Sequence, residues 1–276
     1  MSVKWNGQPA DLMIALHARR SYAEMLRFSA LHPDRPIVLV LTGTDIYRDI
    51  QYDVDAQTSV KLASRIVVLQ EQGALELAPA LRPRVRVIYQ SSPRLKSVHR
   101  PVRHFDICSV AHLRAEKDPF RAALAAQLLP GVSRIRVTHV GGPLDAGTSE
   151  QADRLAAGHS RWRWLGALTH GETRRRISRS HLLVLSSRME GGANVICEAV
   201  MAGTPVLASH IPGNVGMLGA DYAGYFPLGD TQALADLMLR AERDLSFYRH
   251  LNAQCAARAP LFEPAREAAA VQALVQ

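Results

Sequence analysis

The stretch "LLVLSSRMEGGANVICEAVMAGTPVLAS" at residues 182–209 indicates the fold most clearly. It begins with an apolar run, 182–187, which predicts a parallel strand that is covered on both faces. A glycine loop then leads into a predicted helix that ends at Gly203, and Pro205 starts the next strand. Strand, helix and strand in this order form the repeating unit of doubly wound α/β proteins.

The same alternation extends over the whole chain. Short β-branched runs are separated by helix-length amphipathic segments, which predicts an α/β fold with doubly wound parallel sheets. A proline- and arginine-rich stretch without periodicity, 91–103, divides the strands into two groups and is the predicted domain linker. The predicted strands cover 11–16, 36–42, 65–70, 84–89, 105–111, 135–141, 161–166, 182–187, 205–209 and 223–227.

Length and composition limit the class of protein. A chain of 276 residues exceeds one ordinary core and suits two domains. No apolar run approaches the roughly 18 residues that span a bilayer, so we expect no membrane insertion. The opening residues lack an export signal, and three widely spaced cysteines argue against a disulfide framework. The cytoplasm is therefore the predicted location.

The net charge of +8 attracts polyanions of any kind, including phosphorylated metabolites. The arginine-rich stretches 82–103 and 174–179 contain few aromatic residues and match no zinc-finger or RNA-binding motif. We interpret them as mostly solvated surface, and we expect no nucleic-acid partner.

Residues that directly follow parallel strands are the first candidates for chemistry, because ligands bind beyond the carboxyl ends of such strands. After the first strand, His17, Arg19 and Arg20 occupy a strand-to-helix loop that could hold a phosphate, and a solvated surface loop is the alternative. Ser21 and Glu24 are predicted to form a capping box at the start of the next helix.

Two further loops follow strands. In "TGTD" at 42–45, Gly43 permits a close backbone approach, and Thr44 and Asp45 are candidates for binding a substrate hydroxyl; a plain turn is the alternative. In "VAHLRAEKDP" at 110–119, Arg114 and Lys117 could neutralise the charge on a departing diphosphate. Surface pairing with the neighbouring acidic residues is the alternative for these two cations.

Residues 182–209 also contain the strongest site signal. Gly191 and Gly192 would admit a diphosphate to the free N–H groups at the start of the helix. Glu190 lies before the helix and can accept hydrogen bonds from a sugar, while Glu198 lies further along and can take the hydroxyls of a ribose. A nucleotide sugar has these three parts in this order.

These residues resemble a known family. Glu190 and Glu198, with "AVMAGTPVLAS" after them, are similar to the nucleotide-sugar site of retaining GT-B glycosyltransferases. More narrowly, the chain resembles the selenosugar synthases of selenoneine biosynthesis. The matching segments are "ALHARRS" (15–21), "LTGTDIYRDI" (41–50), "VVLQ" (67–70), "AHLRAEKDP" (111–119), "SRMEGGANVICEA" (187–199) and "DYAGYFPLGD" (221–230).

The resemblance implies an activity and its substrates. A hexosyltransferase of this kind would move GlcNAc or Glc from UDP-GlcNAc or UDP-Glc to selenophosphate, giving a 1-selenosugar with release of UDP and phosphate. It implies no cofactor and no metal. A selenium nucleophile is already anionic near neutral pH, so the reaction does not need a strong general base.

The resemblance also assigns residues. Glu190 would bind the sugar hydroxyls and Glu198 the ribose. The family clamps the pyrophosphate with an arginine and a lysine; His112 and Lys117 stand at those positions here, and Arg114 would compensate for the missing arginine. Glu190, Lys117 and His17 are the catalytic candidates. The diphosphate would meet the backbone of Gly191, Gly192, Ala193 and Asn194, and selenophosphate would meet His17, Arg19, Arg20, Thr44 and Asp45.

The implied fold is GT-B, with two Rossmann-like domains that face a cleft. The expected boundaries are 1–98 for an N-terminal acceptor-side domain, 99–262 for a C-terminal nucleotide-sugar-binding domain, and 263–276 for a C-terminal helix that packs back on the first domain. Proteins of this fold normally begin with a strand and a helix that have no counterpart before 11–16. We therefore expect the N-terminal sheet to lack them, and activity to be weak without them.

Several alternatives stay open from the residues alone. An ordinary hydroxyl acceptor competes with selenophosphate, and a sugar-nucleotide epimerase or a non-catalytic UDP-sugar binder would use the same scaffold. "DVD" at 53–55 matches the metal-binding motif of the unrelated GT-A transferases, but it precedes a helix and is predicted to cap it. Trp162 and Trp164 are predicted to pack in the core. The histidines and cysteines show no metal-ligand spacing.

Overall fold

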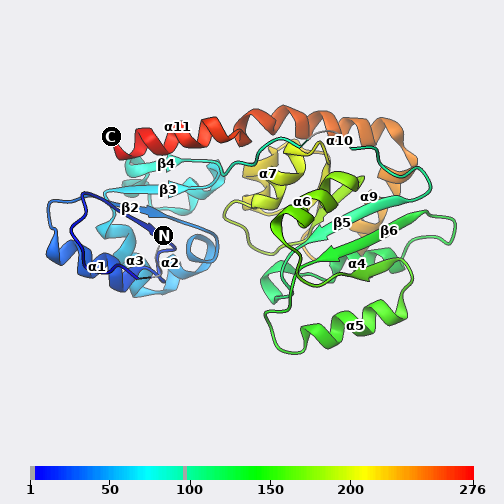
Figure 1. Cartoon of the computed structure of the whole chain (residues 1–276), viewed down its shortest axis with the longest axis horizontal. Coiled ribbons are helices and arrows are strands. Elements are labelled where there is room, and N and C mark those ends of the chain that lie inside the picture. Colours follow the sequence, from blue (N-terminus) through cyan, green and yellow to red (C-terminus); the bar gives the residue numbers. More distant parts are fainter. Residues whose placement is uncertain (1–3, 96–97) are drawn as a thin grey trace.

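The protein has two parallel sheets, seen in a computed structural model that describes residues 4–95 and 98–276. The first sheet has the order β1-β2-β3-β4, and the second has the order β10-β9-β8-β5-β6-β7. Figure 1 shows the first sheet on the left and the second on the right. Residues 96–97 of the predicted linker lie outside the described residues.

The four-stranded sheet and its helices come from the first third of the chain. Its strands are β1 (Met13–Leu16), β2 (Ile37–Val40), β3 (Arg65–Val68) and β4 (Val85–Val87). The helices are α1 (Tyr22–Leu31), α2 (Ile50–Tyr52) and α3 (Val54–Leu62), with a π-helical turn η1 (Asp45–Asp49) after β2. β1 lies at the edge of this sheet.

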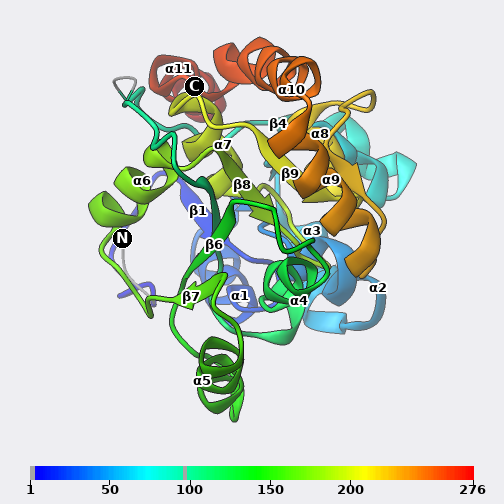
Figure 2. The same cartoon turned by 90° about the vertical axis from the view of Figure 1, so that its right-hand side faces the viewer.

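The six-stranded sheet has helices on both faces; Figure 2 shows α6 and α7 on one face and α4 and α9 on the other. Its strands are β5 (Phe105–Val110), β6 (Ile135–Val140), β7 (Trp162–Trp164), β8 (Leu182–Leu185), β9 (Val206–Ser209) and β10 (Tyr225–Phe226). Its helices are α4 (Arg121–Gln127), α5 (Thr148–Gly158), α6 (His170–Arg179), α7 (Asn194–Met201), α8 (Pro212–Leu218), α9 (Thr231–Arg243) and α10 (Leu245–Arg258).

The predicted fold class is confirmed. Each predicted strand is present, shortened by a few residues at its ends, and all pairs of neighbouring strands are parallel. β8 and β9 are buried along their whole length, which explains why they are apolar without alternation. Trp162 is buried in the core as predicted, and Asp53 caps α3 by accepting the backbone N–H of Ala56 at 2.8 Å.

The predicted capping box at α1 is wrong, although the helix does follow Ser21. The Ser21 hydroxyl donates to the carbonyl of Leu16 at 2.7 Å instead of capping the helix. Glu24 Oε2 is buried without a hydrogen-bond partner among the described residues. The tight turn after β1 brings the Leu16 carbonyl within reach, and a local side-chain-to-backbone bond then competes with the cap.

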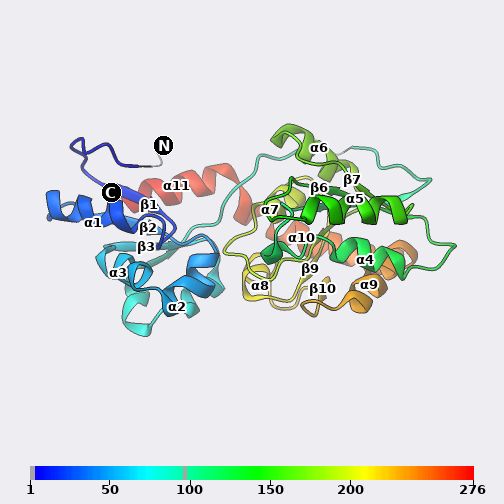
Figure 3. The ribbon, with the colours of Figure 1, turned by 90° about the horizontal axis from the view of Figure 1, so that it is seen from below.

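The last helix, α11 (Pro264–Val275), returns to the four-stranded sheet. Figure 1 shows it alongside β4, and Figure 3 shows it in the half of the molecule that contains β1, β2 and β3, while α10 lies in the other half. Leu274 packs in one apolar cluster with Val38 and Val67, and Glu267 accepts the Ser91 backbone N–H at 2.9 Å. In the described part of the chain, no helix is both long and apolar enough to cross a membrane.

Candidate active site

Glu190, in the loop between β8 and α7, forms an ion pair with Lys117. Lys117, at the end of a short 3-10 turn η4 (Ala115–Lys117), places Nζ 2.6 Å from Glu190 Oε1. The two side chains are 19% and 9% exposed. A charge buried to this extent needs a partner, so the pair fixes both loops relative to one another. Gly213 of α8 supports the arrangement, because a Cβ there would lie 1.8 Å from the Glu190 carbonyl oxygen.

A cavity of about 390 Å³ opens beside this pair, at the carboxyl ends of β5, β6 and β8. Its position is the one expected for ligands of doubly wound sheets. The predicted donor-side residues His112, Lys117, Glu190, Gly192, Ala193 and Asn194 all line it. The structure thus brings together residues from two segments that are far apart in the sequence.

Two other predicted donor-side residues, Arg114 and Gly191, lie outside the lining of this cavity. Arg114 precedes η4, and its Nε is buried without a hydrogen-bond partner in the described residues. A compensating role of Arg114 at the diphosphate stays a prediction. A Cβ on Gly191 would lie 2.2 Å from the carbonyl oxygen of Thr42, so the contact between the two domains already requires glycine there. Gly192 packs in the same way on Leu69, with 2.4 Å between its ideal Cβ and the Leu69 Cβ.

Glu198 lies on α7, almost buried, with two hydrogen-bond donors. His170 Nε2 is 2.7 Å from Oε1, and Asn194 Nδ2 is 3.3 Å from the same oxygen. Asn194 is one helical turn before Glu198, so the sequence spacing already places these two side chains on one face. His170 was not among the residues predicted for the site, because it comes from a different helix and no local pattern links it to Glu198.

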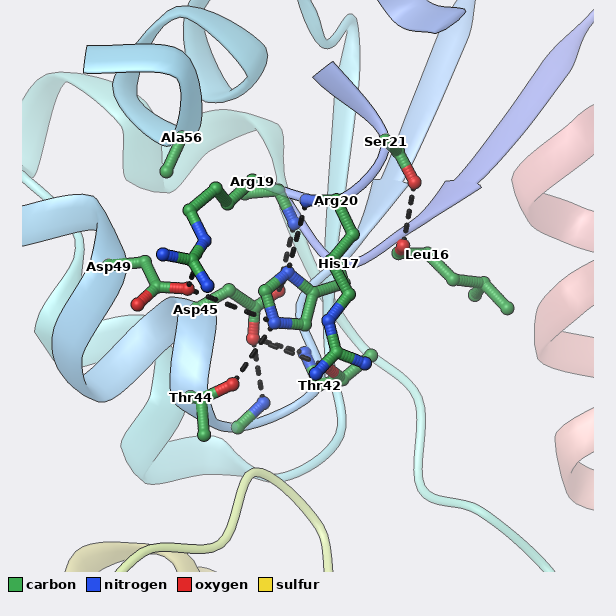
Figure 4. Close-up of polar contacts among 12 residues, drawn as sticks. Leu16, His17, Arg19, Arg20, Ser21, Thr42, Thr44, Asp45, Asp49 and Ala56 are labelled. Atoms are coloured by element: carbon green, nitrogen blue, oxygen red, sulfur yellow. Dashed lines mark hydrogen bonds and ion pairs between the residues drawn. The ribbon is translucent and has the colours of Figure 1, made fainter. Parts of the chain in front are cut away.

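On the acceptor side, His17 and Asp45 hold two loops together (Figure 4). His17 adopts a left-handed backbone with a φ of 74°, and its Nε2 is 3.0 Å from Thr44 Oγ1. Asp45 is fully buried and accepts the backbone N–H groups of Ala18 at 3.0 Å and Gly43 at 2.8 Å. These bonds make Asp45 an anchor between the loops after β1 and β2; direct substrate binding by it stays a prediction.

Burial lowers the pKa of His17 below 6.5, and the nearby Asp45 opposes that shift only in part. The imidazole is therefore neutral near pH 7. Its Nδ1 accepts the backbone N–H of Arg20 at 3.4 Å, so the remaining proton lies on Nε2 and points to Thr44. Both ring nitrogens are thus engaged by the protein itself.

Asp49 is a second buried carboxylate in this region, and sequence reasoning missed it. Arg19 Nε is 3.4 Å and Arg48 Nε 2.9 Å from its oxygens, and both arginines stay about half exposed. Figure 4 shows Arg19 and His17 turned toward Asp49. Arg20 is exposed and lines another cavity, of about 460 Å³, beside β1 and α1. Arg19 and Arg48 therefore present the positive charge around Asp49.

The donor-side and acceptor-side loops touch each other. Gly43, with a φ of 154°, would place a Cβ 3.1 Å from the backbone N of Gly191, which confirms the predicted close approach at Gly43. Arg48 Nη1 also lies 3.7 Å from Glu116 Oε1, next to Lys117. The candidate donor and acceptor residues thus meet where β2 and β8 end. Within the described residues, no group of three or more His, Cys, Asp or Glu side chains is arranged to hold a metal ion.

Comparison with known proteins adds a family and several structures of the same fold. The family glycosyl transferases group 1 matches residues 94–258, more than half of the chain. No curated protein matches the chain at a significant level. Among solved structures, Anabaena HepE in complex with UDP and glucose is similar with a TM-score of 0.76 and 18% identity, over 96% of this chain and 77% of that one.

Two further structures show the same architecture. Sucrose-phosphate synthase from Thermosynechococcus elongatus has a TM-score of 0.73 and 19% identity, over 95% of this chain and 72% of that one. A UDP-forming α,α-trehalose-phosphate synthase from Burkholderia vietnamiensis has a TM-score of 0.77 and 14% identity, over 97% and 74%. At these identities the likeness establishes the fold.

Proposed function

The chain belongs to the glycosyl transferases group 1, and from this premise we propose that it moves a hexose from a UDP-sugar to selenophosphate. The selenium atom attacks the anomeric carbon, and the bond from that carbon to the diphosphate oxygen breaks, so UDP leaves. Water then cleaves the selenium–phosphorus bond, which releases phosphate and gives a 1-selenosugar. The hexose is glucose or N-acetylglucosamine.

The observation that carries the donor half is the ion-paired Glu190 at the wall of the 390 Å³ cavity. Glu190 accepts hydrogen bonds from sugar hydroxyls, and Lys117 lies within 2.6 Å of it. Lys117 stabilises the negative charge that develops on the diphosphate as the bond breaks. His112, in the same segment after β5 as Lys117, also lines the cavity and contributes a donor to the same phosphates.

The start of α7 supports the diphosphate site. Ala193 precedes the helix and Asn194 is its first residue, and both line the cavity. The first N–H groups of a helix have no partner within it, and the helix dipole favours an anion at this end. The diphosphate would therefore bind between these N–H groups and Lys117, with the sugar toward Glu190.

The acceptor half rests on charge and on the state of His17. Arg19 and Arg48 are the exposed cations around the buried Asp49, and a dianionic acceptor such as selenophosphate would pair with them. His17 keeps both ring nitrogens on protein atoms, so we assign it the task of shaping this loop. An acceptor that is already ionised needs no proton transfer to His17, whereas a hydroxyl acceptor would need a base.

The choice of donor is supported by proteins of similar structure. HepE was crystallised with UDP-glucose, and a pneumococcal O-GlcNAc transferase was crystallised with UDP and GlcNAc. Both nucleotide sugars are therefore the first to test here. The three cysteines are free and buried, which supports a cytoplasmic setting.

Mass spectrometry tests the proposal directly. The protein is incubated with UDP-GlcNAc or UDP-Glc and with selenophosphate, thiophosphate or glycerol, alongside Glu190→Gln and the surface control Arg175→Ala. We expect a selenosugar from one UDP-sugar with the native protein and with Arg175→Ala, and none with Glu190→Gln. A product with glycerol alone would replace selenophosphate by a hydroxyl acceptor. UDP-sugar interconversion without any acceptor would identify an epimerase, and UDP binding without turnover a non-catalytic binder.

A further inference from the structure

The contact between His170 and Glu198 joins two helices that flank the cavity. His170 is the first residue of α6 and Glu198 lies in α7. We propose that His170 is a positioning residue of the donor site, which holds one oxygen of Glu198 so that the other accepts a ribose hydroxyl. This inference rests on the proposed function, because it takes UDP as the ligand.

The geometry distinguishes the two oxygens of Glu198. His170 Nε2 lies 2.7 Å and Asn194 Nδ2 lies 3.3 Å from Oε1. A carboxylate has acceptor sites on both oxygens, so Oε2 can still accept. Within residues 4–95 and 98–276, both side-chain donors to Glu198 end on Oε1. The carboxylate is therefore oriented with one oxygen already bonded and the other available for a ligand.

The two partners differ in how they are held. The Glu198 side chain is 6% exposed, whereas that of His170 is 72% exposed. The backbone at His170 is fixed, because Thr169 caps α6 and forms a capping box with Glu172. Most of the imidazole surface is exposed, and the bond to Glu198 sets its position. The hydrogen bond from the exposed histidine therefore fixes the orientation of the buried carboxylate.

The pair also lies next to the cavity. Thr173, one turn after His170 on α6, lines the cavity, and so does Asn194, one turn before Glu198 on α7. A ribose bound near these two positions would meet Glu198 between the diphosphate at the start of α7 and a base further along the cavity. His170 would then act on the ribose through Glu198, without a direct role at the diphosphate.

Loss of His170 should therefore affect recognition of the ribose hydroxyls selectively. In His170→Ala, Asn194 alone would orient Glu198, and the carboxylate would rotate more freely. A charge-assisted hydrogen bond at a partly exposed site is worth a roughly three- to tenfold change in affinity. We expect the Kd for UDP to rise by about that factor, while the Kd for 2′-deoxy-UDP changes much less.

Calorimetric titration of UDP and 2′-deoxy-UDP tests this inference with three variants. His170→Ala removes the donor, His170→Gln keeps an N–H of similar reach, and His250→Ala is the matched control on an exposed face of α10. We expect a smaller preference for UDP over its deoxy analogue in His170→Ala, partial recovery in His170→Gln, and no change in His250→Ala. With UDP-sugar as substrate, KM should rise and kcat should stay nearly constant.

Two results would overturn the inference. Equal losses for UDP and 2′-deoxy-UDP in His170→Ala would show a general structural effect, and unchanged affinities would show that His170 has no role. The proposed function fails separately: if UDP binds with the expected preference but no selenosugar forms, selenophosphate is the wrong acceptor and the role of His170 stands. If the native protein binds no UDP, the proposed function and the role of His170 are both wrong.

Discussion

The donor side and the acceptor side of this protein use charge in different ways. On the donor side, Lys117 and Glu190 form a compact ion pair at the wall of an open cavity. On the acceptor side, Asp45 and Asp49 are buried among backbone N–H groups and arginines. The charged groups of the donor side can therefore bind a ligand, whereas the two carboxylates of the acceptor side hold its loops in place.

This contrast indicates that the donor side contains the groups that act on the substrate, and that the acceptor-side carboxylates fix the shape of their loops. A charged pair that lines a cavity can exchange its mutual bond for bonds to a ligand. A carboxylate that accepts several backbone N–H groups is costly to remove and has little capacity left for a ligand. We therefore expect substitutions on the donor side to affect activity most, and those on the acceptor side to affect the structure of the loops.

The largest effect is expected at the ion pair. Lys117→Met would leave the Glu190 charge nearly buried and unpaired, which lowers the free energy of unfolding by about 3 kcal/mol. Loss of a cation at the leaving group would lower kcat by roughly 10²- to 10³-fold. Chemical denaturation and transfer assays measure the two effects.

A double variant separates stability from activity at this pair. Lys117→Met with Glu190→Gln contains no unpaired charge, so most of the stability should return while the activity stays lost. If the single variant Lys117→Met keeps native stability and native turnover, the pair has neither role, and the contrast between the two sides disappears.

The next effect concerns the place where the two sides touch. Gly191→Ala would put a Cβ 2.2 Å from the Thr42 carbonyl oxygen, and backbone atoms on both sides would have to move. We expect a loss of about 1–3 kcal/mol in unfolding free energy and a lower kcat/KM, because the acceptor loop shifts relative to Glu190.

Gly171→Ala is the matched control for that prediction. Its Cβ would meet no atom within 4 Å, and Gly171 lies in the first turn of α6. The change should leave activity intact and raise stability by about 0.5–1 kcal/mol, since alanine loses less backbone freedom on folding. If Gly191→Ala and Gly171→Ala have the same stability and activity, the contact between Gly191 and the Thr42 loop contributes to neither property.

The contrast between the two sides also explains what the sequence could predict. The strands and part of the cavity lining follow from local patterns, because parallel strands present the residues after them at one edge of a sheet. Lys117, Glu190 and Gly192 were predicted in this way, the family resemblance added His112 and Asn194, and all five line one cavity. The buried Asp49 and the contact of His170 with Glu198 depend on tertiary pairing between separate elements, which no local spacing encodes.

The wrong prediction of a capping box at Ser21 has a physical cause of the same kind. Ser21 has the residue type and spacing of a capping box, but the turn after β1 offers its hydroxyl a nearer carbonyl. The assignment of Gly191 to the diphosphate stays a prediction, and the Thr42 carbonyl is an independent reason for a glycine at that position. Local chemistry predicts what a residue is able to do, and the packing partner selects among these options.

The pH dependence of stability should separate the two sides further. Burial lowers the pKa of His139, beside the donor cavity, to about 4, and it also lowers that of His17 on the acceptor side. A folded-state pKa below the unfolded value means that the unfolded chain binds more protons, so stability falls as the pH falls below about 6.5. His139 alone should lower the unfolding free energy by about 2 kcal/mol between pH 7.5 and pH 5.

Denaturation at a series of pH values in His139→Gln tests this sign and size. The variant should lose most of that pH dependence, whatever its stability at pH 7.5, because glutamine does not titrate. His17→Gln should remove a further part, between pH 6.5 and the lowered folded value. A native profile that is flat from pH 7.5 to pH 5 would contradict the burial of both imidazoles.

The smallest effect is expected at the ion pair that joins the two sides. Arg48 Nη1 and Glu116 Oε1 are 3.7 Å apart, and the side chains are 46% and 33% exposed. Such a pair contributes less than about 1 kcal/mol, and salt weakens it. Glu116→Gln should therefore leave stability almost unchanged.

Glu116→Gln tests whether the donor side and the acceptor side are energetically coupled. Arg48 would lose its partner on the donor side but keep Asp49, at 2.9 Å, on the acceptor side. If the pair merely lies on the surface, the KM values for both substrates stay the same in low and in high salt. If it couples the sides, Glu116→Gln raises the acceptor KM in low salt only, and a cycle with Arg48→Met shows that the two changes are not additive. The second result would mean that donor-side charge helps to place the acceptor loop, so the two sides, different in chemistry, would act as one site.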